Sequence, residues 1–235
     1  MQIVVRHLSK AYGLLWALRD VSLELRPGDF IALVGPNVAG KTTFLKLLAL
    51  LLEPTTGEIQ LDGEQLSLRA PQFRPLVGLL SPSQHLYENL SAKENLLFFT
   101  ALYGKKKTRQ ELEEALDQVG LSECLDHFVG SLSAGMKCRL SLAKWMLLDS
   151  RFLLVDEPYG TLDKSGGDLL EAYLSALCQR GGIVVVATHN ISRVLDLCSR
   201  ALILHQGKLI FDEPRQEPWE SFSRAFGGFL PRGKQ

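Results

Sequence analysis

Two groups of residues in this sequence have the types and spacing that phosphate chemistry requires. In the first, Gly35 and Gly40 are separated by four residues and followed by Lys41 and Thr42, which is the spacing of a phosphate-binding loop. Backbone N–H groups at the start of a helix bind phosphate oxygens there, because unpaired donors and the helix dipole both favour an anion. The lysine adds charge near the β- and γ-phosphates, and the threonine hydroxyl ligates Mg²⁺. The pattern predicts binding of a nucleoside triphosphate with Mg²⁺.

The second group consists of polar residues that directly follow apolar runs. Asp156 and Glu157 come after the run 152–155, and His189 comes shortly after the β-branched run 183–187. Such continuous runs are typical of parallel strands, and ligands bind beyond the carboxyl ends of such strands. Neighbouring side chains on an extended chain diverge, so we expect one carboxylate to hold Mg²⁺ while the other polarises the attacking water. We expect His189 to contact the γ-phosphate.

The elements that position these residues follow from hydrophobic periodicity. An apolar strand at 30–34 leads into the loop, and a helix over 41–52 leaves it. Further strands are predicted at 3–6, 21–25, 58–63, 76–80, 152–157, 183–187 and 201–204, followed by a hairpin through 206–208. Residues 8–13 are predicted to form a turn. Helices are predicted at 92–102, 108–119, 134–148 and 165–180, and the first three form a helical lobe inserted between strands of an α/β core.

Composition limits the class of protein. The chain has 235 residues, of which 46% are hydrophobic, enough for one large domain or two closely joined lobes. Lys and Arg total 26, as do Asp and Glu, so we expect no nucleic-acid partner. The cysteines form no CxxC pair, which favours reduced thiols. The longest apolar run, 47–52, is too short for a membrane span of about 20 residues, so we expect a soluble chain that would need another chain to span a membrane.

A third segment, Leu132-Ser133-Ala134-Gly135-Met136, lies about 20 residues before the carboxylate pair. Together with the phosphate loop, the carboxylate pair, the segment 159–163 and His189, it makes nearly the whole sequence resemble the ATP-binding cassette family. The resemblance implies a P-loop NTPase (RecA-like) α/β core with a mixed or parallel sheet, an N-terminal antiparallel β subdomain and an inserted helical subdomain. The implied single domain, 1–235, divides into a core at 1–83 and 150–212, a helical subdomain at about 84–149 and a tail at 213–235.

The resemblance also implies roles for individual residues. Glu157 would be the general base, His189 would hold the water and the γ-phosphate, and Lys41 would assist them. Mg²⁺ would be held through Thr42, Asp156 and Gln84. Contacts with ATP are implied for Tyr12, Gly35, Pro36, Asn37, Val38, Ala39, Gly40, Lys41, Thr42 and Thr43, and for Ser133, Ala134, Gly135 and Asp163. Tyr12 would stack on adenine, although a turn or core aromatic is the alternative for that residue. The segment 133–135 would contact the γ-phosphate of the opposite subunit, and Asp163 would link the two sites.

The sequence departs from the family pattern in three places. The segment 133–136 reads Ser-Ala-Gly-Met where Ser-Gly-Gly-Gln is usual, and Met136 cannot donate a glutamine's hydrogen bonds. Val38 stands where glycine is usual; because a β-branched residue at positive φ is an outlier, we expect an ordinary φ there. Gln84, the candidate Mg²⁺ ligand after the strand 76–80, comes one or two places later than expected.

The implied function is that of an ATP-binding and hydrolysing transporter subunit. Two cassettes would pair head-to-tail at the cytoplasmic face of the cell membrane, with an integral membrane permease docked in a groove formed by about 79–99. The stretches 86–99 and 101–104 and the signature segment, Ser133-Ala134-Gly135, look most like single-cassette exporters, and most like the haem exporter used in cytochrome c maturation. Two alternatives stay open: a soluble cassette ATPase that acts on DNA or ribosomes, and a nucleotide-binding regulatory module that no longer hydrolyses ATP.

Overall fold

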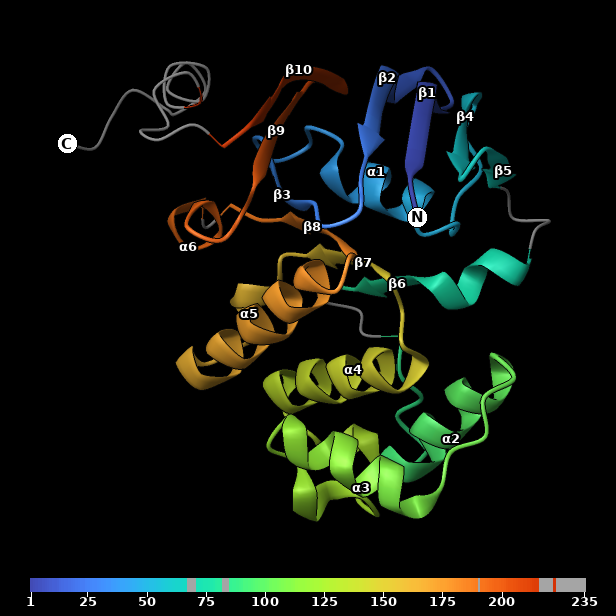
Figure 1. Ribbon diagram of the computed structural model, residues 1–235, viewed down its shortest axis with the longest axis vertical. Helices are drawn as coiled ribbons and strands as arrows, with labels where there is room; N and C mark the ends of the chain where they lie inside the picture. Colours follow the sequence, from blue (N-terminus) through green and yellow to red (C-terminus); the bar gives the residue numbers. More distant parts are fainter. Residues whose placement is uncertain (67–70, 82–84, 190, 216–221, 223–235) are drawn as a thin grey trace.

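A six-stranded mixed sheet forms the centre of the molecule. The computed structural model describes residues 1–66, 71–81, 85–189, 191–215 and 222. The strands lie in the order β10-β9-β3-β8-β7-β6, and all are parallel to their neighbours except β10, which runs antiparallel to β9 (Figure 1). Their bounds are β3 Phe30–Val34, β6 Val77–Leu80, β7 Phe152–Asp156, β8 Ile183–Ala187, β9 Arg200–His205 and β10 Lys208–Pro214.

The central strands are buried on both faces. In β3, Phe30, Ala32 and Val34 belong to the apolar core shared with the helices α4 (Ala134–Leu148) and α5 (Lys164–Gln179). Ile31 and Leu33, which alternate with them, belong to a second core on the opposite face, shared with α1 (Lys41–Leu48). This double burial explains the continuous apolar runs of these strands. The predicted α/β core with a mixed or parallel sheet is therefore confirmed.

A second sheet is antiparallel and covers the second core. It has the order β2-β1-β4-β5, with β1 at Ile3–Tyr12, β2 at Leu15–Leu25, β4 at Thr56–Leu61 and β5 at Glu64–Leu66. The predicted turn at 8–13 is wrong, because β1 continues to Tyr12 and pairs with β2 almost to the hairpin tip. Three register shifts along this pair break the two-residue period by which the strands were predicted, and His7 and Asp20 have positive φ.

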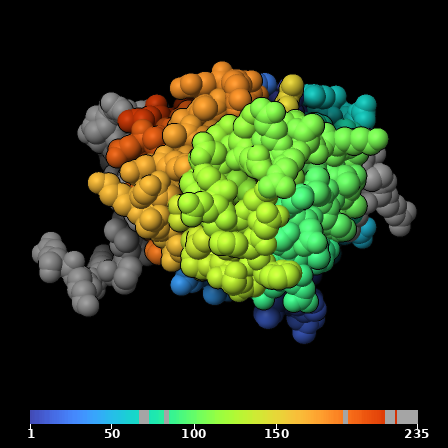
Figure 2. All heavy atoms as spheres, turned by 90° about the horizontal axis from the view of Figure 1, so that it is seen from below, coloured from blue at the N-terminus to red at the C-terminus, as the bar shows by residue number. Residues whose placement is uncertain are grey.

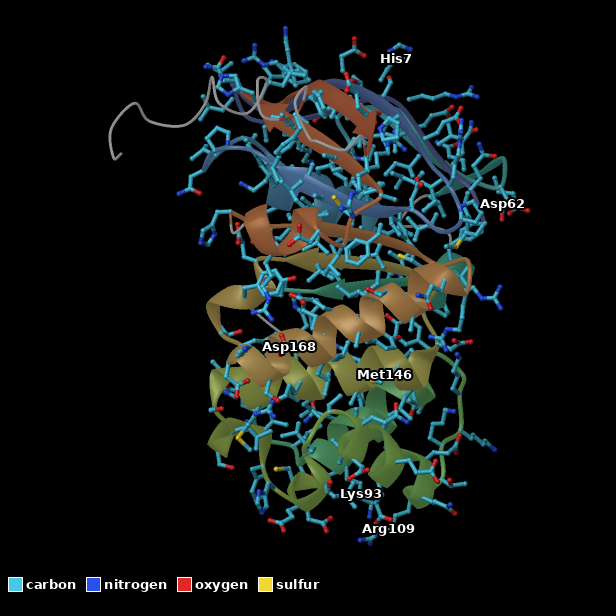
Figure 3. The ribbon with its side chains drawn as sticks, turned by 60° about the vertical axis from the view of Figure 1, so that its left-hand side comes forward. His7, Asp62, Lys93, Arg109, Met146 and Asp168 are labelled. Carbon is cyan, nitrogen blue, oxygen red and sulfur yellow. The ribbon has the colours of Figure 1, made fainter. Side chains whose placement is uncertain are left out.

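The helices α2 (Ala92–Leu102), α3 (Arg109–Gln118) and α4 form a compact group beside the sheet, as Figures 1 and 2 show. Lys93 and Arg109 lie at the end of the molecule opposite His7 (Figure 3). Ser91 and Thr108 each form a capping box with a glutamate, and these boxes determine where α2 and α3 begin. The bounds predicted for α2 and α4 are confirmed, and α3 is one residue shorter at each end.

The helix after the phosphate loop ends earlier than predicted. α1 stops at Leu48 rather than at residue 52, and Leu50 has a φ of 55°. The leucines after this point therefore belong to a turn, although their hydrophobicity extended the helical pattern. No helix in the part of the chain that the structure describes is long and apolar enough to cross a membrane.

Lys144 is a charged side chain buried inside the helical group. It is 2% exposed, and its Nζ lies 4.5 Å from the centre of the Phe99 ring and 4.7 Å from that of Trp145. Burial lowers the pKa of Lys144 from 10.5 to about 7. Cation–π contacts with the two rings offset part of the cost of removing the ammonium group from water.

This burial makes stability depend on pH in a defined direction. The unfolded chain keeps the ordinary lysine pKa, so between pH 7 and 10 it binds more protons than the folded chain, and stability rises with pH. One pKa unit corresponds to about 1.4 kcal/mol, so we expect Lys144→Met to raise the free energy of unfolding by roughly 2–4 kcal/mol at pH 6.5. The gain should shrink toward pH 10. Urea denaturation at several pH values measures it, with Lys106→Met as the exposed control. A gain that does not change with pH would contradict this account.

Candidate active site

Two glycines shape the loop between β3 and α1. Gly35 and Gly40 have φ values of 151° and 105°. A Cβ atom on Gly35 would lie 2.2 Å from the carbonyl oxygen of Leu204, and one on Gly40 would lie 2.4 Å from that of Ala17. No side chain fits at either position, so the backbone of the loop can pack closely against β9 and the N-terminal sheet. The N–H groups at the start of α1 then face the space in front of the loop.

Lys41 is the cationic group of this loop. Its Nζ donates hydrogen bonds to the carbonyl oxygens of Gly35, at 2.7 Å, and Pro36, at 3.2 Å. Burial lowers the pKa of Lys41, and the negative charges of Glu157 and Asp156 oppose that shift. The side chain is therefore folded back over the loop, where phosphate oxygens are expected to bind.

Thr42 and Asp156 form an oxygen-rich pair in the same place. The Thr42 hydroxyl donates a hydrogen bond of 2.8 Å to Asp156 Oδ2. Asp156 Oδ1 is buried and accepts no hydrogen bond from the residues that the structure describes. Burial raises the pKa of Asp156, with the hydrogen bond from Thr42 opposing the shift. A hydroxyl and a carboxylate with one unsatisfied oxygen suit Mg²⁺, which prefers oxygen ligands.

Glu157 and His189 meet at the neighbouring strand ends. Glu157 Oε2 lies 2.8 Å from His189 Nδ1 and accepts the backbone N–H of His189 at 3.2 Å. The backbone of Glu157 has a φ of 46°, and its N–H donates to the carbonyl of Ala187 at 2.8 Å. Asp156 and Glu157 thus point to different partners, but the predicted strand 152–157 ends at Asp156 and Glu157 is not extended. A left-handed residue at this position is strained and persists only because its surroundings hold it.

A cleft of about 510 Å³ lies in front of these groups. Its size is within the range of cofactor sites. It is lined by Tyr12, Leu15, Trp16, Ala17, Asn37, Val38, Ala39, Gly40, Lys41, Thr42, Thr43, Asp156 and Glu157. The structure therefore places Tyr12, the phosphate loop and the carboxylate pair around one space, and His189 reaches it through Glu157.

This cleft is not lined by Ser133, Ala134, Gly135 or Asp163, four residues of the predicted site that the structure describes. Ser133 caps α4, accepting the Met136 N–H at 3.2 Å, and Asp163 caps α5, accepting the Gly166 N–H at 2.9 Å. A Cβ atom on Gly135 would lie 2.9 Å from the carbonyl oxygen of Thr161, so the start of α4 packs against the segment that leads to Asp163. Gln84, the predicted Mg²⁺ ligand, lies outside the described residues.

The expectation for Val38 is wrong. Val38 has a φ of 68°, in the left-handed region that favours glycine, and the residue is 99% exposed. The loop therefore keeps the backbone shape that glycine would give it and accepts the steric cost of a β-branched residue. Nothing in the packing compensates for this cost, because the side chain contacts almost nothing.

Sequence reasoning missed the apolar wall of the cleft. Leu15, Trp16 and Ala17 follow the hairpin turn and line the cleft beside Tyr12. The predicted turn at 8–13 had placed Tyr12 outside any strand, so its neighbours across the hairpin were not recognised. The signal that could have found them is the apolar triplet itself, which begins two residues after Gly13.

The geometry defines a P-loop nucleotide-binding site on a mixed α/β sheet, and comparisons with known proteins agree. A family model described as ABC transporter matches residues 18–160. The chain is 30% identical over 208 residues to the ABC transporter ATP-binding protein NatA of Bacillus subtilis (strain 168), covering 87% of this chain and 85% of NatA. It is 34% identical over 207 residues to the Nod factor export ATP-binding protein I of Burkholderia orbicola (strain AU 1054), covering 87% of this chain and 68% of that protein.

A solved structure of an ATP-binding cassette also matches this chain. The dimeric ATP-binding cassette MJ0796, in a post-hydrolysis state with ADP and Pi, matches with a TM-score of 0.83 and 25% identity, covering 91% of this chain and 99% of that one. This chain belongs to the ABC transporter family. It is the ATP-binding, ATP-hydrolysing subunit of such a transporter.

The strain at Val38 leads to a stability prediction. A left-handed conformation costs an L-residue roughly 1–2 kcal/mol, and the greater freedom of glycine in the unfolded chain offsets part of what glycine would recover. We expect Val38→Gly to raise the free energy of unfolding by about 0.5–1 kcal/mol. Urea denaturation measures it. Val38→Ala, which keeps a Cβ atom, should recover less, and equal effects of the two variants would rule out backbone strain as the cause.

Proposed function

We propose that two copies of this chain pair head-to-tail and drive export through a separate integral membrane permease at the cytoplasmic face of the membrane. The proposal rests on the observation that the predicted site residues lie in two separate places on one chain. Tyr12, the phosphate loop and the carboxylate pair line one cleft, whereas Ser133, Ala134 and Gly135 do not. A second copy could bring its own signature segment to this cleft, where the N–H groups at the start of its α4 suit a phosphate anion.

Within one cleft, the residues of this chain would have separate roles in binding ATP and Mg²⁺ and in hydrolysis. The loop 35–40 and Lys41 would bind the phosphates of ATP, and Tyr12 would stack on adenine. Thr42 and Asp156 would hold Mg²⁺, which neutralises charge on the phosphates when it is bound. Glu157 would accept the proton of the attacking water, and His189, held 2.8 Å from Glu157, would orient the base.

A groove beside the helical group supports the proposed permease partner. It has a volume of about 250 Å³ and lies between the end of α1, β6 and the helices α2 and α4. Leu51, Phe99 and Trp145 give it apolar surface, and the exposed Arg74 gives it a basic group. No acidic residue is among those that line it in the described part of the chain. An amphipathic segment of the permease with an acidic residue would match this lining.

Aromatic residues next to the groove extend this surface. Tyr87 and Phe98 are exposed and their rings lie 5.0 Å apart, while Phe98 and Phe99 lie 5.3 Å apart. Exposed aromatic clusters beside a groove are typical of interaction surfaces. The cluster falls within the stretch 86–99, whose resemblance to exporters is the support for export as the direction of transport.

The narrower proposal is that the cargo is haem for cytochrome c maturation. It rests on the resemblance of the stretch 86–104 and of the signature segment 133–135. Deleting the gene and following covalent attachment of haem to c-type cytochromes tests it. Normal attachment in the deletion strain would exclude haem as the cargo and leave the ATP-driven transport role intact.

The alternative function, a regulatory module that no longer hydrolyses ATP, is supported by two departures from the family pattern, Val38 and Met136. Val38 nevertheless keeps the left-handed backbone of the loop. Met136 leaves the Ser133 cap in place, because the bond uses the Met136 backbone N–H. With Lys41, Asp156, Glu157 and His189 assembled as described, hydrolysis is the function that the site supports best.

The first test is the mass in solution of Glu157→Gln, with and without Mg-ATP. Removing the base should keep ATP intact and trap the closed pair, so we expect a shift from monomer to dimer when Mg-ATP is added. Lys41→Ala in the same background is the control and should remain monomeric. A monomer under saturating ATP would contradict a pair that forms from this chain alone. Adding Met136→Gln then shows whether the signature is the limiting part.

The permease groove is tested through a single exposed leucine. Leu51 lines the groove and is 49% exposed, so Leu51→Asp adds charge without disturbing the core. We expect this variant to lose most of its association with the membrane fraction of its source cells, because a buried aspartate would oppose docking.

Ile210 provides the matched control. It is 45% exposed on β10 and does not line the groove. Ile210→Asp should therefore sediment with membranes as the natural chain does. Equal membrane association of the two variants would exclude this groove as the docking site.

A further inference from the structure

Arg193 is held by two carboxylates of the neighbouring helix. It lies on α6 (Ile191–Leu195), four residues after His189. Its Nε donates a hydrogen bond of 2.5 Å to Glu171, and its terminal NH2 nitrogen donates one of 2.5 Å to Asp168. Both acceptors belong to α5, on which Asp168 is labelled in Figure 3. Two donors of one planar guanidinium are thus fixed on one helix.

The faces of the guanidinium are also in contact. Arg193 Cζ lies 5.1 Å from the centre of the Tyr159 ring, within the range of a cation–π contact. A Cβ atom added to Gly167 of α5 would come within 2.8–2.9 Å of three guanidinium atoms. Glycine destabilises a helix interior. Its presence at 167 therefore has a specific use, because it leaves room for the guanidinium to lie against the helix.

These contacts join the chain segments that follow both catalytic groups. Tyr159 is two residues after Glu157, Arg193 is four residues after His189, and α5 begins at its Asp163 cap. We propose that Arg193 is a positioning residue for ATP hydrolysis, which holds Glu157 and His189 in register by fixing α6 and Tyr159 to α5.

The catalytic pair depends on such support from outside the cleft. The His189 side chain is 76% exposed, so packing does little to hold it. Glu157 has a left-handed backbone, which is strained unless its neighbours constrain it. Their mutual hydrogen bond fixes the distance between them but not the place of the pair relative to the phosphate loop. Arg193 supplies that constraint from the segments immediately downstream.

The test compares steady-state ATP hydrolysis by Arg193→Met and by Arg200→Met. Arg200 is a matched control, because it also pairs with carboxylates, donating to both Asp212 oxygens at 2.6 Å, but on β9 and β10. We expect kcat to fall about tenfold in Arg193→Met with KM for ATP changed less than twofold. Arg200→Met should keep kcat within twofold.

Two further variants separate positioning from general stability. Arg193→Lys keeps one ion pair but cannot lie flat between Tyr159 and Gly167, so we expect it to recover only part of kcat. Gly167→Ala improves the helix intrinsically while its methyl group displaces the guanidinium, so kcat should fall although no charge is lost. Normal kcat in both Arg193→Met and Gly167→Ala would overturn the proposal.

Hydrogen–deuterium exchange gives a readout that does not depend on turnover. In Arg193→Met, amides of the segments 157–163 and 188–195 should exchange faster than in the natural chain, while those of α4 remain unchanged. Arg200→Met should leave both segments unchanged. If Arg193→Met speeds exchange throughout the chain, or in neither segment, Arg193 does not position the catalytic pair.

Discussion

The hydrogen bond between Thr42 and Asp156 is the interaction on which the site depends most. It joins residues 114 apart in sequence, the first at the start of α1 and the second at the end of β7. These two elements meet because β3 and β7 both pair in parallel with β8 in the central sheet. The bond satisfies one oxygen of Asp156 and leaves the other buried without a described partner. The sheet thus delivers a carboxylate to the phosphate loop with one oxygen still available to a cation.

The two apolar cores on opposite faces of the central sheet determine which elements carry each part of the site. Alternate residues of β3 serve different cores, one shared with α1 and the antiparallel sheet, the other with α4 and α5. The phosphate loop therefore lies with the second core, which α1 shares, and the signature segment at the start of α4 lies with the helical group. A second copy of the chain is needed to bring the two parts of the site together in the proposed pair.

The sequence was sufficient to predict the site and the elements wherever a residue type or spacing has few possible roles. Gly35, Lys41 and Thr42 at fixed spacing, and carboxylates after an apolar strand, located the cleft, and regular periodicity located α2 and α4. Prediction failed where long-range packing decides the conformation. Bulges in β1 hid residues 7–12 of that strand, and the exposed Val38 took a glycine-like φ because the loop around it requires that shape. The contacts of Arg193 join segments distant in sequence, and no local pattern indicates them.

Close packing between Gly135 and the Thr161 carbonyl has a consequence for how the signature can vary. A side chain at 135 would separate α4 from the segment leading to Asp163. Position 134 is exposed, and the Met136 side chain packs partly buried against the core. Ala134, which stands where the family usually has glycine, adds a methyl group at an exposed position, and Met136 replaces glutamine without adding heavy atoms. The space around each residue therefore decides which substitutions the segment 133–136 can accept.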